Sequence, residues 1–167
     1  MKTIPFFLIL MILFSCNNSE NTSNSNEYFY GYFGNSKNNQ NIHLTIKTRF
    51  DECGEWGGHT EKITVFNKND SKKLFAKYEE TDYDCSNGNQ NPKIVKSKEN
   101  EIKENEKNEI RIYLKKLVEF KSNSFVSGNS GMSYSAVAQD STFIIYSYNN
   151  DDDCKIAFKK LKSNLNF

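Results

Sequence analysis

The sequence predicts an α+β domain, with an antiparallel sheet of about five or six strands and one or two packed helices. Two patterns support this fold class. Apolar and polar residues alternate over 42–50, as in a strand with one solvent-facing side. Apolar residues then fall at helical spacing between Ile110 and Val118, with Glu and Lys on the opposite side. The chain has 167 residues, which suits a single folded domain.

The first half of the domain reads as strands joined by polar turns. Strands are expected at residues 28–33, 42–50, 60–66 and 72–78. In the second of them, Leu44 and Ile46 face inward, whereas His43 lies on the solvent face beside Lys47 and Arg49. The inward positions of the next two strands are Ile63, Val65, Leu74 and Ala76. Together these strands form an antiparallel meander.

The second half combines helices with a hairpin. A short strand is expected at 93–97, a helix at 105–122, and a β-hairpin at 133–138 and 142–148 that turns at 139–141. The apolar positions of the last segment favour a final helix, which the polar turn at 149–153 could begin. These positions are Cys154, Phe158, Leu161 and Leu165.

The N-terminal segment is interpreted as a cleaved export signal. Lys2 precedes an apolar stretch from Ile4 to Phe14 that is too short to span a bilayer, which takes about 20 residues. The ending Leu13-Phe14-Ser15-Cys16 resembles the lipobox of bacterial lipoproteins, such as those of the Bacteroidota. The resemblance implies a signal peptide at 1–15 and a lipid on Cys16, which places the protein at the outer membrane, facing the periplasm or the cell surface. Residues 16–27 are then a disordered, Asn/Ser-rich tether, and 28–167 form the domain.

The remaining cysteines would lie in an oxidising compartment, where Cys53, Cys85 and Cys154 allow three pairings. A Cys53–Cys85 disulfide is favoured because both residues sit in polar, turn-rich loops at the ends of expected strands. Cys154 lies in an apolar pattern and is expected to be a small buried residue.

The loop at 51–59 is the densest polar feature and contains the only tryptophan, Trp56. Three interpretations are open. The loop is structural, with Trp56 folded over the sheet as a lid; it is a binding loop that exposes Trp56; or His59 joins Glu61, Glu52 or Glu55 in a metal site. The structural interpretation is preferred, because the glycines allow positive φ and the bridge would fix the loop. The metal site is disfavoured, because the chain has no second histidine close to His59.

Tyrosines form a second candidate binding surface. Tyr28, Tyr30 and Tyr32 share one face of the first strand, and Tyr146 and Tyr148 share one face of the hairpin. Such rings stack on sugars or pack against a protein partner, although tyrosines more often form the margin of a core.

Function follows only coarsely from these features. Lys and Arg number 22 and Asp and Glu 21, so no basic excess indicates nucleic acid, and no nucleophile-elbow, zinc-protease or phosphate-loop motif is present. The sequence therefore predicts a lipid-anchored envelope protein with a non-catalytic binding or structural role and no cofactor. Its partners would be the membrane, through the anchor, and an envelope protein or glycan. The alternatives are a carbohydrate-binding accessory lipoprotein, an immunity or inhibitor lipoprotein and, as an outsider, a metal-dependent enzyme.

Overall fold

A computed structural model describes residues 42–68, 73–87, 91–123, 131–148 and 152–167. The predicted signal peptide, lipidation site, tether and first strand at 28–33 lie outside the described residues, as do Tyr28, Tyr30 and Tyr32. Neither helix in the described part of the chain combines the length and apolar character that crossing a bilayer requires.

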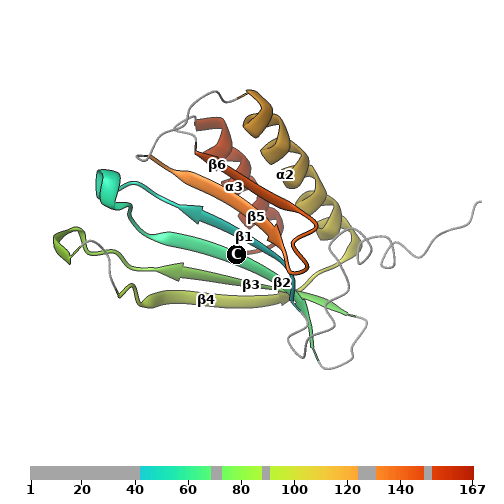
Figure 1. Ribbon diagram of the computed structural model, residues 1–167. Helices are drawn as coiled ribbons and strands as arrows, with labels where there is room; N and C mark the ends of the chain where they lie inside the picture. Colours follow the sequence, from blue (N-terminus) through green and yellow to red (C-terminus); the bar gives the residue numbers. More distant parts are fainter. Residues whose placement is uncertain (1–41, 69–72, 88–90, 124–130, 149–151) are drawn as a thin grey trace, which may run out of the picture.

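Six antiparallel strands form one sheet (Figure 1), in the order β4-β3-β2-β1-β5-β6. They are β1 (Ile42–Arg49), β2 (Thr60–Asn67), β3 (Leu74–Thr81), β4 (Ile94–Glu101), β5 (Ser133–Ala138) and β6 (Ile144–Tyr148). The first four strands follow one another as a meander, and β5 returns to pair with the free side of β1. The fold is therefore α+β, as the sequence predicts.

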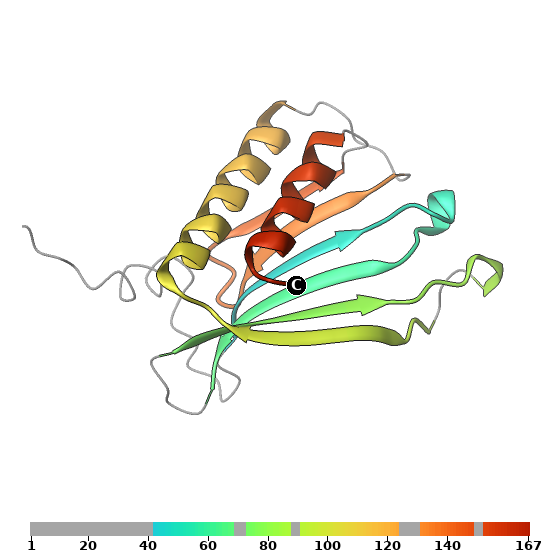
Figure 2. The ribbon, with the colours of Figure 1, turned by 180° about the vertical axis from the view of Figure 1, so that it is seen from behind.

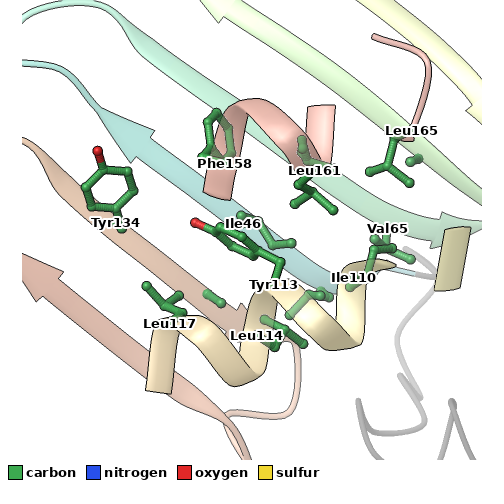
Figure 3. Packing of buried hydrophobic residues seen from close by; sticks show 14 of the residues in the cluster. Ile46, Val65, Ile110, Tyr113, Leu114, Leu117, Tyr134, Phe158, Leu161 and Leu165 are labelled. Carbon is green, nitrogen blue, oxygen red and sulfur yellow. The ribbon is translucent and has the colours of Figure 1, made fainter. Parts of the chain in front are cut away.

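Two helices, α2 (Glu104–Asn123) and α3 (Asp152–Asn164), lie on one face of the sheet. They cover the part formed by β1, β5 and β6, whereas β3 and β4 extend beyond them (Figure 2). The core fills the space between these layers (Figure 3). Its fully buried side chains include Ile46 and Val65 from the sheet, Ile110 and Leu117 from α2, and Phe158 from α3. The alternation in β1 and the helical spacing in α2 and α3 thus bury their predicted apolar sides.

The start of α2 is stabilised by its own side chains. Glu106, in the first turn, accepts a hydrogen bond of 2.6 Å from the backbone N–H of Lys103, which precedes the helix. This is the carboxylate half of a capping box, and it satisfies a backbone donor that the helix itself cannot pair.

Strand β4 is longer than predicted, because it spans Ile94–Glu101 rather than 93–97. Almost all of its side chains are exposed, so no apolar alternation marks the strand in the sequence. It is held by backbone pairing with β3, which also extends further than expected, to Thr81. Backbone hydrogen bonding of this kind leaves no side-chain signal.

Two expected side-chain orientations are wrong. His43 is buried at 5% exposure rather than solvent-facing, because a bulge between Ile42 and Leu44 shifts the β1–β2 register and Nε2 of His43 contacts Oδ1 of Asn67. Val118 is 46% exposed although it falls within the apolar spacing of α2, because it lies at the margin of the helix face that meets the sheet.

Candidate binding site at the loop end of the sheet

The disulfide between Cys53 and Cys85 joins two loops at one end of the sheet. Cys53 lies in the β1–β2 loop, next to the short 3-10 helix η1 (Gly54–Trp56), and Cys85 begins η2 (Cys85–Asn87) in the β3–β4 loop. Both loops extend past the helices at the same end of the molecule (Figure 1). The favoured cysteine pairing is thus confirmed. Cys154 lies outside the bridge and is buried at 1% exposure, as expected.

The β1–β2 loop has a defined backbone. The N–H of Cys53 donates to the carbonyl of Gly57 at 2.7 Å, and the N–H of Phe50 donates to the carbonyl of His59 at 3.0 Å. Gly57 has a φ of 84°, a conformation that favours glycine. Gly58 leaves room for Glu52, whose carboxylate would clash with any β-carbon at that position. The glycines therefore allow the chain to close a tight loop around the Glu52 side chain.

Trp56 points into solvent, with 72% of its surface exposed. The interpretation of Trp56 as a lid over the sheet is therefore wrong. The reason is local, because η1 is a single turn with no buried residue, so it does not bring the indole into the core. Across the disulfide, Tyr83 is 47% exposed on the other loop. The joined loops thus present two large aromatic side chains to solvent.

His59 lies beneath this tip, between two carboxylates. Its ring stacks on Phe50 with centroids 4.0 Å apart. Nδ1 of His59 contacts Oε1 of Glu52, and Nε2 lies 3.5 Å from Oε1 of Glu61. Glu52 and Glu61 thus contact different ring nitrogens, on opposite edges of the imidazole. A metal ion bound to one of these nitrogens could not be coordinated by both carboxylates. Within the described ranges, no group of three or more His, Cys, Asp and Glu side chains is arranged to hold a metal ion.

Glu61 continues into a buried polar network that sequence reasoning missed. The hydroxyl of Tyr78 lies 2.7 Å from Oε2 of Glu61 and 2.7 Å from Oε2 of Glu80, so one phenolic proton serves two carboxylates. Nζ of Lys162, on α3, donates to Oε2 of Glu61 at 2.5 Å and to the Tyr78 oxygen at 3.1 Å. The ammonium group thus supplies a hydrogen bond and a positive charge to the buried carboxylate of Glu61.

The environment of Tyr78 keeps its phenol protonated. Burial, followed by hydrogen bonds to Glu80 and Glu61, raises the pKa of Tyr78 far above its usual value near 10. An activated tyrosine nucleophile needs the opposite shift. Phe167 stacks on the Tyr78 ring with centroids 5.5 Å apart, and Asn100 of β4 donates to the carbonyl of Leu165 at 2.9 Å. The network therefore joins the C-terminus to the part of the sheet that the helices leave uncovered.

The structure separates the sequence-predicted site residues into two groups. His59 and Glu61 belong to the polar network, whereas Trp56 stands apart on the exposed tip. Tyr78, Glu80 and Lys162 were missed, although Glu61 and Glu80 occupy inward positions of their strands. An acidic residue at an inward position was a usable signal, because a buried carboxylate needs a partner.

Tyr146 and Tyr148 share one face of β6, as predicted, and their rings meet edge to face with centroids 4.8 Å apart.

Comparisons with protein-family models, with curated proteins and with solved structures find no match.

Loss of the disulfide should destabilise the domain. Replacing Cys53 and Cys85 by serine removes a cross-link between residues 32 positions apart, which should lower the free energy of unfolding by about 3–4 kcal/mol. Urea denaturation of the variant and of the wild type, each with and without reductant, measures the difference. Reductant should destabilise the wild type alone, and peptide mapping that finds Cys154 in the bridge would contradict the assignment.

Lys162→Met should cost about 3 kcal/mol of unfolding free energy, because it leaves Glu61 as a buried carboxylate without its cation. Lys160→Met, at an exposed position on the same helix, is the matched control and should change stability by less than about 0.5 kcal/mol. The double variant Lys162→Met/Glu61→Gln should recover part of the loss, because it removes the orphaned charge. Additive effects of the two substitutions would show that the pair does not interact.

Proposed function

We propose that this chain is a lipid-anchored envelope protein that binds a partner protein through its disulfide-joined loop tip. The tip is defined as residues 51–56 and 82–86, whose side chains are exposed except for that of Cys53, which is partly buried. The observation that carries the proposal is the 72% exposure of Trp56 on a loop that is held by backbone hydrogen bonds and by the Cys53–Cys85 bridge.

An exposed tryptophan on a braced loop suits recognition for two reasons. The indole can bury a large apolar area against a partner, and tryptophan is enriched among the residues that dominate binding energy. The bridge also limits the conformational entropy that is lost on binding, because it already cross-links the two loops at Cys53 and Cys85. A purely structural loop needs the glycines and the disulfide, but it gains nothing from exposing Trp56.

The charge of the tip indicates the kind of surface it meets. Its exposed acidic side chains are Asp51, Glu52, Glu55, Asp82 and Asp84, and its sequence contains no Lys or Arg. A partner with a basic rim around an apolar pocket complements this pattern. Since the loops project beyond the helices, insertion into a cleft of the partner fits better than closure around a small ligand (Figure 2). This favours the immunity or inhibitor class among the binding roles.

A carbohydrate partner is the second candidate. Trp56 and Tyr83 offer flat rings, and the acidic oxygens near them could accept hydrogen bonds from sugar hydroxyls. The two candidates predict different eluents, because a glycan ligand is displaced by free saccharide, whereas a protein partner is recovered as a stoichiometric polypeptide.

Trp56→Ala should weaken partner binding at least about thirtyfold, which corresponds to a hot-spot loss of roughly 2 kcal/mol. The assay is capture from envelope extract on the immobilised domain, followed by titration of the recovered polypeptide or saccharide. Ile156→Ala removes a side chain that is 60% exposed on α3, outside the residues that define the tip, and should leave binding unchanged. Equal binding by the Trp56→Ala and wild-type proteins would exclude the tip as the binding surface.

Lipid anchoring is tested separately. Cys16→Ser should release the chain from the membrane fraction and remove the acyl mass from the intact protein, because the lipid would be attached to the thiol of Cys16. Ser15→Ala, beside it, should leave both properties as in the wild type. Membrane retention of Cys16→Ser would overturn the anchor and leave the binding proposal to stand on Trp56 alone.

A further inference from the structure

The two outer strands of the described sheet differ in how they resist further pairing. Strand β4 carries alternating charges, including Lys96, Lys98, Glu99 and Glu101, which are typical of a protected edge. Strand β6 has the sequence Ile-Ile-Tyr-Ser-Tyr, with neither a charged residue nor a proline. Among the described strands, β6 is therefore the edge that can accept another strand.

Apolar side chains are exposed on both sides of this edge. On the sheet face away from the helices, Ile144 is 61% and Tyr146 44% exposed. On the helix side, Val118 of α2 is 46% exposed. The groove between α2 and α3 is lined by Glu109, Ile112 and Lys116, so Val118 lies on the opposite flank of α2. Because α2 packs over β5 and β6, that flank lies towards the outer side of β6.

We propose that residues 28–33 of this chain pair with β6 as a seventh, antiparallel strand. Their sequence is Tyr-Phe-Tyr-Gly-Tyr-Phe, an aromatic run without a charged residue. The segment precedes β1 and is separated from it by residues 34–41. Aromatic residues favour strands, and an uncharged aromatic edge is complemented by a strand of the same kind.

Strand polarity selects β6 over β4. A segment that runs towards the start of β1 and then turns back into it must be antiparallel to β1. Since every neighbouring pair in the sheet is antiparallel, β6 runs in the same direction as β1, and β4 runs in the opposite direction. The incoming segment would therefore be antiparallel to β6 but parallel to β4. Parallel pairing is less stable per residue, and it would place the aromatic run against the charged edge.

The connecting chain is long enough to reach the β6 edge. The start of β1 lies at the same end of the sheet as the start of β6, because Thr45 pairs with Val137 and Val137 pairs with Ile144. From β1 to a position outside β6 is three strand spacings, or about 14 Å. The nine steps from Phe33 to Ile42 can span up to roughly 30 Å when extended. Residues 34–41 can thus pass around the β5–β6 turn with slack.

The alternation of side chains in the segment matches the two faces of the edge. Phe29 and Phe33 would occupy the helix side and cover Val118, which is a dry environment. Tyr28, Tyr30 and Tyr32 would occupy the other face and continue the row of Tyr146 and Tyr148, where their hydroxyls reach water. These three tyrosines then complete the sheet instead of forming a separate binding surface.

Hydrogen exchange of the full chain in detergent, measured by mass spectrometry, tests the pairing. Amides of residues 28–33 should exchange at least about tenfold more slowly than those of 17–27, and this protection should not depend on protein concentration. Tyr30→Pro removes a backbone donor from the segment and should abolish the protection of 28–33 and speed the exchange of β6. Asn21→Pro, in the expected tether, is the matched control and should change neither. Ile144→Lys places a charge on β6 and leaves the sequence of 28–33 unchanged. It should also abolish the protection of the 28–33 amides.

Two outcomes would overturn the proposal. Exchange of 28–33 as fast as that of 17–27 would show that the segment is not a strand in this domain. Protection of β6 that survives Tyr30→Pro but falls on dilution would assign the edge to a second copy of the chain. Unchanged exchange in β1, β2 and β3 verifies that each variant remains folded.

Discussion

The pairing of β1 with β5 is the contact on which the rest of the domain depends. It aligns Leu44 with Ala138 and Arg49 with Ser133, and so joins the meander, which ends at Glu101, to a hairpin that begins only at Ser133, after loop and helix. Without this pairing, β1 to β4 would form an open sheet with no helix over it. The pairing places the core side of β1 beneath α2 and α3, so that Ile46 becomes fully buried. Such non-local contacts bear a loop-closure cost, which the shared apolar core must offset.

The helices cover only part of this sheet, and the polar network lies where their coverage ends. Inward positions near the helices hold apolar residues such as Ile63, whereas the first inward position of β2 and the last of β3, which pair with each other, hold Glu61 and Glu80. Glu61 is buried and Glu80 partly buried, so both carboxylates need polar partners, which are the Tyr78 hydroxyl for both and Lys162 for Glu61. At the margin of the core, the hydrogen bonds and the ion pair of this network thus take the place of apolar packing.

The sequence predicts elements well where one face of an element is buried, and poorly elsewhere. The period of two in β1 and the helical spacing in α3 follow directly from one-sided burial. The length of β4 does not follow from one-sided burial, because it depends on backbone pairing with β3. The burial of His43 does not follow either, because it depends on a bulge in β1. In the site, the Cys53–Cys85 bridge followed from loop chemistry, but the contact of Lys162 with Glu61 joins residues 101 positions apart and carries no local pattern.

The direction of β1 relates the loop tip to the N-terminal part of the chain. Residue 42 enters the sheet at one end of β1, and the loop with Trp56 leaves from the other end, after eight residues. An eight-residue strand spans about 26 Å. Without pairing of residues 28–33, the proposed tether from Cys16 would approach the end of the sheet opposite the tip. A run of residues 28–33 along β6 would carry the start of the segment back towards the tip by about six residues, and the tether at 16–27 would then leave beside the open tyrosine face. Under the proposed anchor, the reach of Trp56 from the membrane would thus depend on the same proposed edge pairing that would decide where the tyrosines lie.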